Sequence, residues 1–528
     1  MGQLRRLGVA AVGLSLLAAA CGGSDEDAGG ETDSSVTTVA AASTTAAASA
    51  GTTTTAAPVK TPTSMAEWQA LWKTQREAVV KKIKDAKVGK SADGKTATGT
   101  GGFTINLTKC PTGWSDTEGV TDTEIKIGHN AVYSGTLADY GNISRAIVVQ
   151  GDALNKAGGI TDWKGKTRKV TYMIKDDGYD ATRAVPLIDE LVESDKVFWM
   201  ISLGSPTTMK VYDKLNQRCV PNALALTGHP AWGDPVNHPW TTGLQLAYNT
   251  EAVLWGAFIE KNIDQLGPSG GKAVIAGLIM NNDFGKSYES GFKAFLAESK
   301  FKDRITFVSE TIEPTAPTIT DAMTTLASKK PSMFIAMTAG TSCTQSIQEA
   351  AQNGMKEKVA YLFMPSVCAG KSFIGQDKVG MSGDGWWILS GGIKDLSDKA
   401  FDNDPFIKNG RDELAAAGFD YKSSGSFGSG YLYGWAQLQL LQIAAQLDGG
   451  LTRTNLMIAV RAMDMTHPYL LEGMKFNMNG NLDAYPIEGG VFQKRDAAKE
   501  TWVSQGGVIE LSGKSKNCVW SQTTSNCT

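Results

Sequence analysis

The alternation of short apolar runs with helical patterns constrains this chain more than any other feature. Residues 124–128, 170–175 and 197–202 predict strands, and residues 143–155 and 181–193 between them predict helices. Strands that alternate with helices of this length form βαβ units, in which the strands are parallel. The first half of the chain is therefore expected to build an α/β unit.

The same rhythm returns in the second half. Strands are predicted at 273–279, 333–337 and 360–364, and helices at 285–296 and 344–353. Two such units in tandem predict an α/β protein of two Rossmann-like lobes. In open α/β sheets ligands bind beyond the carboxyl ends of the strands. If the two units face each other, one ligand would be met by Tyr133, Ser134, Gly204, Ser205, Thr227, Gly228, residues 282–284, residues 339–342, Ser366 and Val367.

Charge and motifs exclude several function classes. The 51 basic and 54 acidic side chains give a net charge of −3, which offers no broad positive field for nucleic acid. The four histidines, at 129, 229, 238 and 467, form no metal-binding pair, and neither a Gly-x-Ser-x-Gly elbow nor a phosphate-binding glycine loop occurs. Asp176 and Asp177 follow a strand, where binding of backbone N–H groups is favoured over a metal or catalytic role. We expect no enzyme activity, cofactor or metal.

The first residues predict export. Arg5 and Arg6 precede an apolar stretch at 7–20, which is shorter than the roughly 20 residues that span a bilayer. Residues 1–20 are thus predicted to be a signal peptide. Cys21 directly after the small residues resembles a bacterial lipobox, which implies cleavage before Cys21 and a lipid on its sulfur; an ordinary signal peptide with a chance cysteine is the alternative.

Two segments separate this signal from the βα rhythm. Residues 21–64 are rich in Thr, Ala and Ser and cannot bury enough apolar surface to fold, so we expect a flexible tether. Residues 65–117 are an N-terminal extension that begins with an amphipathic helix over 65–88.

The cysteine count agrees with an oxidising compartment. Without Cys21, six cysteines remain, and six allow 15 pairings. Proximity in the sequence favours Cys518–Cys527 and Cys343–Cys368, which leaves Cys110–Cys219.

Several short motifs, taken in their order along the chain, resemble those of a known protein family. Residues 123–128, 133–135, 155–160 and 175–180, with 476–482 and 490–493 near the end, resemble a type I periplasmic binding protein. The similar subfamily is that of the leucine/isoleucine/valine-binding proteins of ABC importers. The resemblance covers about 118–500.

The resemblance implies two lobes joined by three hinge crossings near 246, 388 and 473, with the ligand cleft between them. Lobe 1 would hold 118–246 and 389–473, and lobe 2 would hold 247–388 and 474–528. Such a protein captures a small solute by hinge closure and delivers it to ABC permease subunits, as a monomer anchored outside the cell membrane or periplasmic. A sensor domain of the same fold is the alternative, and a secreted hydrolase is a weaker one.

The family's binding residues can be placed by position. Ser205 and Thr207, then Thr227 and Gly228, match its carboxylate-binding loops. The aromatic residues of the site match Tyr140, with Tyr133 and Ser134 close by, Phe284 in lobe 2 and Tyr431 in the region of the third crossing.

One position departs from the family. The glutamate that holds a ligand ammonium is expected after the strand at 360–364, where Ser366, Val367 and Cys368 stand instead. Asp283 is a candidate replacement. Because an unpaired buried charge costs several kcal/mol, we expect the carboxylate half of the site to be kept and a free α-amino group not to be required.

Overall fold

The computed structural model describes residues 61–528. The predicted signal peptide, lipidated Cys21 and the tether up to residue 60 lie outside the described residues. Among the helices of 61–528, none is both long and apolar enough to span a membrane.

The first lobe contains a sheet of four strands in the order β4-β5-β3-β6. β3 pairs in parallel with both β5 and β6, and the short β4 is antiparallel to β5. The strands β7 and β8 form a further parallel pair. A parallel β-bridge between Leu203, after β6, and Leu226, after β7, places this pair beside β6. The strands are β3 (Glu124–Ala131), β4 (Ile160–Thr161), β5 (Thr167–Asp176), β6 (Trp199–Ile201), β7 (Asn222–Ala225) and β8 (Thr241–Gly243).

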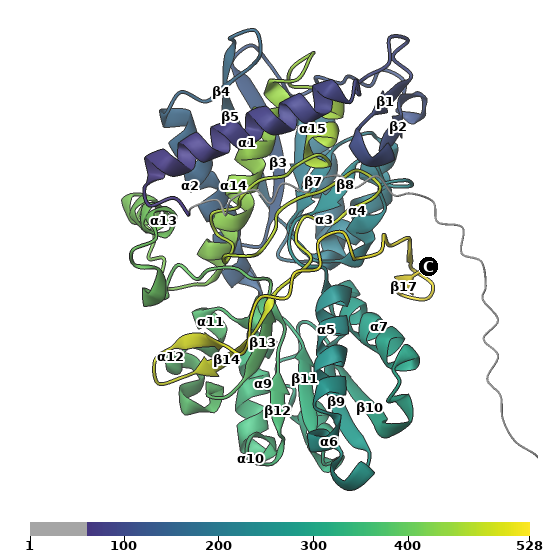
Figure 1. Cartoon of the computed structure of the whole chain (residues 1–528), viewed down its shortest axis with the longest axis vertical. Helices are drawn as coiled ribbons and strands as arrows, with labels where there is room; N and C mark the ends of the chain where they lie inside the picture. The colour runs from purple at the N-terminus through teal and green to yellow at the C-terminus, as the bar shows by residue number, and fades with distance from the viewer. Residues whose placement is uncertain (1–60) are drawn as a thin grey trace, which may run out of the picture. The chain divides into compact units, whose positions relative to one another are not determined.

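The second lobe contains seven strands in the order β10-β9-β11-β12-β13-β14-β15 (Figure 1). The first five are parallel, and β14 and β15 add an antiparallel hairpin at one edge. The strands are β9 (Ala273–Met280), β10 (Ile305–Ile312), β11 (Met333–Met337), β12 (Tyr361–Phe363), β13 (Trp387–Ser390), β14 (Val491–Asp496) and β15 (Thr501–Ser504). Every residue of β11 is buried, as expected for a parallel strand covered on both faces.

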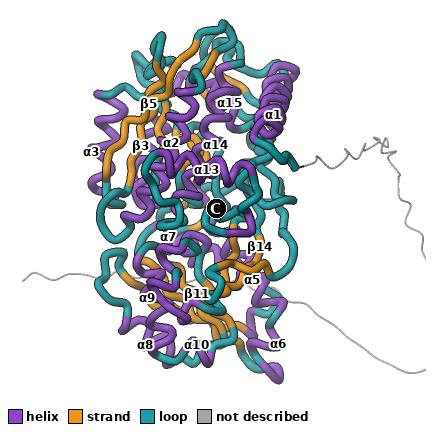
Figure 2. The backbone as a smooth tube through the Cα atoms, turned by 90° about the vertical axis from the view of Figure 1, so that its left-hand side faces the viewer, coloured by secondary structure: helices purple, strands orange, loops and turns teal. Residues whose placement is uncertain are grey.

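Helices cover both sheets. In the first lobe α3 and α1 lie on opposite sides of β3 and β5 (Figure 2). The helix α14 is apolar around most of its circumference and is accordingly almost wholly buried, mainly against α2. The helices of this lobe are α2 (Gly141–Lys156), α3 (Ala181–Asp189), α4 (Ser205–Gln217), α13 (Pro405–Ala416), α14 (Ser426–Ala445) and α15 (Arg453–Val460).

The second lobe has four longer helices and four helices of a single turn among the described residues. They are α5 (Tyr248–Lys261), α6 (Ile263–Leu266), α7 (Asp283–Glu298), α8 (Thr320–Ser328), α9 (Thr341–Gln352), α10 (Met355–Lys358), α11 (Lys371–Ile374) and α12 (Gln376–Val379). The expected α/β fold of two lobes is thus confirmed, with the predicted strands and helices placed within a few residues.

The chain passes between the lobes three times: between β8 and α5, between β13 and α13, and between α15 and β14. Within the segment 474–528, β14 and β15 join the second sheet, whereas the N–H of Met478 donates to the carbonyl of Met463 beside the first lobe. The lobe boundaries themselves stay a prediction.

The N-terminal extension packs on the first lobe. Helix α1 (Met65–Asp85) is capped by Ser64 and buries Trp68, Trp72, Val79 and Ile83 against α13, α14 and α15. It is followed by the antiparallel pair β1 (Thr96–Thr98) and β2 (Thr104–Asn106). The expected amphipathic helix is therefore confirmed.

All three favoured cysteine pairs are formed: Cys110–Cys219, Cys343–Cys368 and Cys518–Cys527. The first ties the extension to the loop after α4. The last closes the C-terminal hairpin of β16 (Trp520–Ser521) and β17 (Asn526–Cys527), which lies beside the first lobe where the Cys518 N–H donates to Gly233.

Candidate functional site

A cavity of about 310 Å³ lies between the two lobes. Its wall includes Leu203, Leu226, Ala339 and Ser366, which closely follow β6, β7, β11 and β12. These positions are the carboxyl ends of parallel strands, where open α/β sheets bind ligands. The two sets of strand ends therefore face one cavity, as the alternating pattern predicted.

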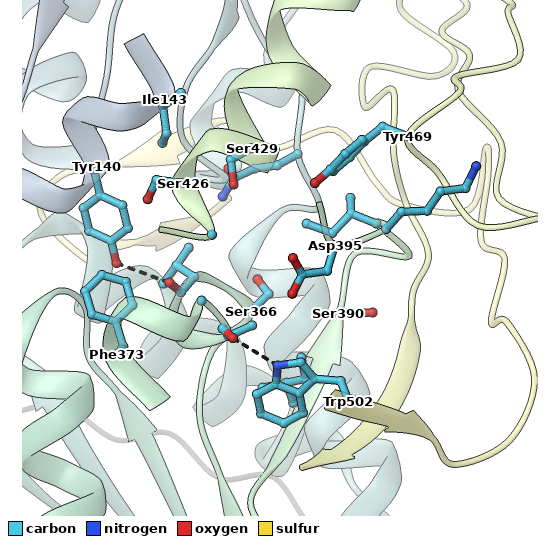
Figure 3. Close-up of a pocket in the computed structure, with 18 of the residues that line it drawn as sticks. Tyr140, Ile143, Ser366, Phe373, Ser390, Asp395, Ser426, Ser429, Tyr469 and Trp502 are labelled. Carbon is cyan, nitrogen blue, oxygen red and sulfur yellow. Dashed lines mark hydrogen bonds between the residues drawn. The ribbon is translucent and has the colours of Figure 1, made fainter. Parts of the chain in front are cut away.

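Apolar and aromatic side chains form much of the cavity wall (Figure 3). Burying a ligand's apolar surface against them would contribute about 25 cal/mol for each Å² removed from water. The side chains of this kind come from both lobes: Ile143, Leu203, Leu226, Phe284, Val367, Phe373, Ile388, Ile393, Phe401, Leu471 and Trp502.

Tyr140 joins the two lobes directly. Its hydroxyl accepts a hydrogen bond from the N–H of Gly340 at 3.1 Å and donates to the carbonyl of Val367 at 3.3 Å. Its ring lies 5.5 Å from that of Phe373, and burial raises the pKa of Tyr140. A side chain at Gly340 would be strained, because φ is +62° and a Cβ would lie 2.9 Å from Leu137. Close approach of the lobes at this point thus depends on glycine.

Asp139, the neighbour of Tyr140, also links the lobes. Its Oδ2 accepts hydrogen bonds from three serine hydroxyls at 2.8–2.9 Å. Ser424 and Ser426 lie at the start of α14, whereas Ser372 lies in α11 of the second lobe. The turn at 138–140 therefore makes three hydrogen bonds to the second lobe, one through Asp139 and two through Tyr140.

The start of α4 stands at one end of the cavity. Gly204 precedes it with φ +89°, and a Cβ there would lie 2.3 Å from the ring of Tyr179. The hydroxyls of Ser205 and Thr227 lie 2.7 Å apart, both almost fully buried. The Thr207 hydroxyl donates back to the carbonyls of Leu203 and Gly204. Of this group Gly204 lines the cavity, whereas Ser205, Thr207 and Thr227 do not.

The loop after β7 is held by the start of α5. The N–H of Tyr248 donates to the carbonyl of Gly228 at 2.7 Å, and Gln245 Nε2 donates to the Tyr248 hydroxyl at 2.9 Å. Tyr433 in turn donates to Gln245 Oε1. Gln245 and Tyr248 line the cavity with these groups already paired.

Glu251 lies behind the second-lobe wall, fully buried in α5. Its carboxylate accepts from the N–H of Ser366 at 2.8 Å, the Ser366 hydroxyl at 3.1 Å and the Tyr288 hydroxyl at 2.6 Å. Burial raises the pKa of Glu251 to about 7, although these hydrogen bonds oppose the shift. Glu251 was not among the predicted site residues; the one feature that marks it in the sequence is a carboxylate within the apolar run of α5.

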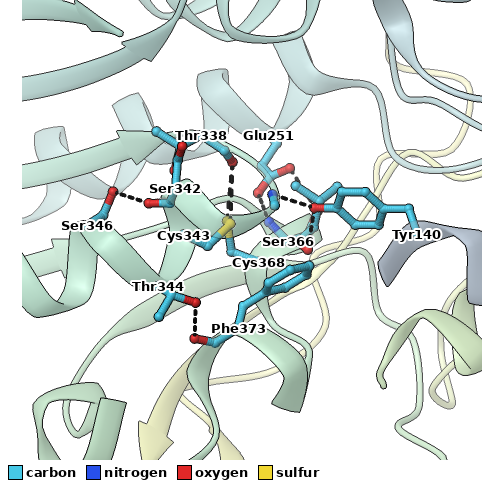
Figure 4. Close-up of a disulfide and its surroundings, with 12 residues drawn as sticks. Tyr140, Glu251, Thr338, Ser342, Cys343, Thr344, Ser346, Ser366, Cys368 and Phe373 are labelled. Atoms are coloured by element: carbon cyan, nitrogen blue, oxygen red, sulfur yellow. Dashed lines mark hydrogen bonds between the residues drawn. A yellow bond between two sulfur atoms is a disulfide. The ribbon is translucent and has the colours of Figure 1, made fainter. Parts of the chain in front are cut away.

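The Cys343–Cys368 disulfide lies against the same wall (Figure 4). Cys343 is in the first turn of α9 and Cys368 in the loop after β12, and both are fully buried. The bond therefore ties together the two segments whose Gly340 and Val367 backbone groups contact Tyr140.

Three of the predicted binding residues, Tyr140, Phe284 and Ser366, line the cavity. Ser205, Thr207, Thr227 and Gly228 are buried next to wall residues but are not among the residues that line the cavity. The binding roles of all these residues stay predictions.

The remaining predicted residues lie away from the cavity wall. Tyr133 packs under the Arg145 guanidinium at 4.6 Å, and Ser134 is its half-buried neighbour. The hydroxyl of Tyr431 donates to Glu413 at 2.7 Å. Asp283, the candidate partner for an ammonium, does not line the cavity either; burial raises its pKa.

Several residues of the cavity wall are not predicted by any pattern in the sequence. Lys394, Asp395 and Asp398 come from the link between β13 and α13, Tyr469 from the segment after α15, and Trp502 from β15. These segments meet only because the chain crosses between the lobes at this side.

The described residues hold no group of three or more His, Cys, Asp or Glu side chains that could bind a metal. Asp176 and Asp177 instead accept hydrogen bonds from backbone N–H groups, of Tyr133 and Gly178 for the first and of Tyr179 for the second, as favoured above. His129 Nε2 lies 2.6 Å from the Ser144 hydroxyl, but both are fully buried away from the cavity wall.

Comparison with known proteins identifies relatives. The model of the family described as periplasmic binding protein matches residues 124–475. No curated protein matches the chain.

Solved structures share the fold. One is a fatty acid ABC transporter substrate-binding protein from Thermomonospora curvata, with 17% identity and a TM-score of 0.59 over 76% of this chain and 95% of that one. A branched-chain amino acid ABC transporter protein from Thermus thermophilus with bound valine has 12% identity and a TM-score of 0.63, over 74% and 97%. A solute-binding protein from Rhodopseudomonas palustris BisB5 in complex with 3,4-dihydroxybenzoic acid has 16% identity and a TM-score of 0.59, over 74% and 98%.

Proposed function

Because the chain belongs to the periplasmic binding protein family, we propose that it captures a small organic solute outside the cytoplasm and delivers it to an ABC permease. The observation that carries this proposal is the cavity enclosed by both lobes at their strand ends. The solute is an amino acid, a carboxylic acid or an amide. The protein acts without chemical turnover.

Closure supplies the signal that a permease can read. The contacts of Asp139 with Ser372, and of Tyr140 with Gly340 and Val367, form only in the closed arrangement. A solute that contacts both lobes stabilises the same closed arrangement and shifts the population toward it. Because each of these hydrogen bonds contributes only about 1 kcal/mol net, the lobes can open again.

The remaining parts of the proposal concern place and partners. A lipid on Cys21 holds the protein to the outer face of the membrane, and the residues up to 60 connect it to the binding unit. The protein works as a monomer, with permease subunits as its partners. Mass-spectrometric detection of a lipid on the peptide that begins at Cys21 tests the anchor separately from solute binding.

The proposal is tested by a thermal-shift screen of the purified protein against amino acids, carboxylic acids and amides. A solute at 100 times its Kd adds about 2.7 kcal/mol to the free energy of unfolding, which raises the Tm. Small-angle X-ray scattering with the same solute should show a more compact protein.

A matched pair of variants gives the control. Ser429 lines the cavity, so Ser429→Trp should abolish the Tm shift, whereas Ser423→Trp, at an exposed position outside the wall, should preserve it. A shift that survives in Ser429→Trp, or a screen with neither a Tm shift nor compaction, would contradict the proposed function.

A further inference from the structure

The two loops that the family resemblance assigned to a solute carboxylate are not part of the cavity wall. They follow β6 and β7 and carry Ser205, Thr207, Thr227 and Gly228, all of them buried. The first N–H groups of a helix have no partner within the helix, so the start of α4 at Ser205 is suited to an anion. The group that occupies these donors therefore decides whether a solute carboxylate can bind there.

The ring of Tyr179 lies against the loop after β6. Its Cε2 would be only 2.3 Å from a Cβ on Gly204. Tyr179 lines the cavity, whereas Ser205, the next residue after Gly204, does not. Burial raises the pKa of the Tyr179 hydroxyl well above its usual value, and a hydrogen bond from the N–H of Ser205 opposes the rise. The phenol oxygen thus engages a donor that a carboxylate oxygen would otherwise use.

Tyr248 has the same relation to the loop after β7. Its Cε1 would be 2.7 Å from a Cβ on Gly228, and it too lines the cavity. Burial raises the pKa of Tyr248 to about 12, and a hydrogen bond from the N–H of Gly228 opposes the rise. The hydroxyls of Ser205 and Thr227 are bonded to each other at 2.7 Å. The donors of both loops are therefore engaged by groups of the protein itself.

Tyr179 is held in place by its backbone. Its φ of +67° is rare for a bulky side chain. Asp177 fixes this conformation, because its Oδ1 accepts from the N–H of Tyr179 at 2.8 Å. Asp177 is fully buried, and its Oδ2 accepts from Asn130 Nδ2 at 2.6 Å. Asn130 Oδ1 in turn accepts from the N–H of Leu203 at 3.1 Å. Strained conformations that neighbouring groups fix in this way cluster at functional sites.

We infer that Tyr179 is a specificity-determining residue whose hydroxyl takes the place of a solute carboxylate at the start of α4. Tyr248 acts in the same way at Gly228. This inference rests on the proposed function and narrows how the solute is held. Solutes that need a carboxylate site at Ser205 and Thr227, α-amino acids included, are disfavoured, and the solute meets the rings of Tyr179 and Tyr248 with a different part of its structure.

The test removes the ring of Tyr179 and measures whether a carboxylate then binds. Tyr179→Gly keeps the positive φ accessible. Wild type and variant are titrated by calorimetry at about pH 7 with 4-methylpentanoate and 4-methylpentanamide, which share one body and differ in charge. The affinity for the acid relative to the amide should rise at least about tenfold in the variant, because the Ser205 N–H becomes available. An unchanged ratio, or no binding of the acid by the folded variant, overturns the inference.

Phe401→Ala is the matched control. Phe401 also lines the cavity but belongs to the link between β13 and α13, so its removal widens the cavity and leaves Tyr179 and Tyr248 in place. The ratio should keep its wild-type value, and a rise equal to that in Tyr179→Gly overturns the inference. Circular dichroism establishes that each variant is folded. Tyr179→Asn, whose short side chain tolerates a positive φ, replaces the glycine variant if that one does not fold.

These results are separable from the proposed function. If an α-amino acid or the acid probe raises the Tm of the wild type, and Ser205→Ala weakens its binding about tenfold, a carboxylate is held at the start of α4. The inference then fails and the proposed function stands. If no solute of the screen gives a Tm shift or compaction while Tyr179→Gly gains binding of the acid, the proposed function fails and the blocking role of Tyr179 stands.

Discussion

The carboxyl group of Glu251 makes one wall of the cavity sensitive to pH. It is buried and accepts hydrogen bonds from both the N–H and the hydroxyl of Ser366, which lines the cavity. Burial raises its pKa from 4.5 to about 7. The folded protein therefore binds this proton more tightly than the unfolded chain does.

The sign of the resulting pH dependence follows. As pH rises from about 4.5 to about 7, the unfolded chain loses the proton first, so the contribution of Glu251 to the free energy of unfolding falls. The loss is on the order of 3 kcal/mol and is complete above the folded pKa. In Glu251→Gln the free energy of unfolding should not show this fall with pH. Urea unfolding at pH values from about 5 to 8 measures the difference.

The difference between the two pH profiles isolates Glu251. Asp177 and Asp483, whose pKa values burial also raises, are present in both proteins. Glu357→Gln, at an exposed position of α10, is the matched control and should follow the wild-type profile. Parallel profiles for wild type and Glu251→Gln would mean that Glu251 does not titrate as described.

Among the elements, the start of α9 and the loop after β12 form one unit through the Cys343–Cys368 disulfide. The bond closes a segment with a sequence separation of 25, which stabilises the folded state by roughly 3 kcal/mol in the chain-entropy treatment. It also holds Gly340 and Val367 at the positions where Tyr140 contacts them.

Replacing both cysteines by alanine should therefore lower both the Tm and the affinity for solute. The matched control is the pair Cys518→Ala and Cys527→Ala, whose disulfide does not border the cavity. That pair should lower the Tm with little change in affinity, measured by calorimetry. A similar loss of affinity in both double variants would contradict a positioning role for Cys343–Cys368.

At the scale of the whole molecule, we expect the turn at 138–140 to influence how readily the two lobes come together. Tyr140→Phe keeps the ring against Phe373 but removes both hydrogen bonds to the second lobe. At about 1 kcal/mol for each net hydrogen bond, solute affinity should fall roughly tenfold or more. Scattering of the solute-free protein should show a larger radius of gyration.

Tyr172→Phe is the control for this variant. The Tyr172 hydroxyl is buried in the first lobe without a hydrogen-bond partner among the described residues and does not line the cavity. Its removal should change neither affinity nor radius. An unchanged affinity in Tyr140→Phe would show that closure does not depend on the Tyr140 hydroxyl.

The sequence by itself determined the two α/β lobes and helix α1, and it favoured the cysteine pairs that form. Strands such as β9 and β11 and helices such as α2 are encoded in local apolar periodicity, which needs no knowledge of distant residues. Parallel strands further dictate that strand ends gather at one edge, so Phe284 and Ser366 could be placed near a common cavity, whereas Tyr140 was placed there by the family resemblance.

Tertiary structure alone decided which groups line the cavity and which of them are already paired within the protein. Asp395 and Trp502 reach the wall because the chain crosses between the lobes, and no local pattern encodes that meeting. The Tyr140 hydroxyl could be assigned to closure only once Gly340 and Val367 were beside it. Burial, charge pairing and hydrogen-bond saturation are properties of segments brought together over hundreds of residues, and they set the chemistry of the cavity.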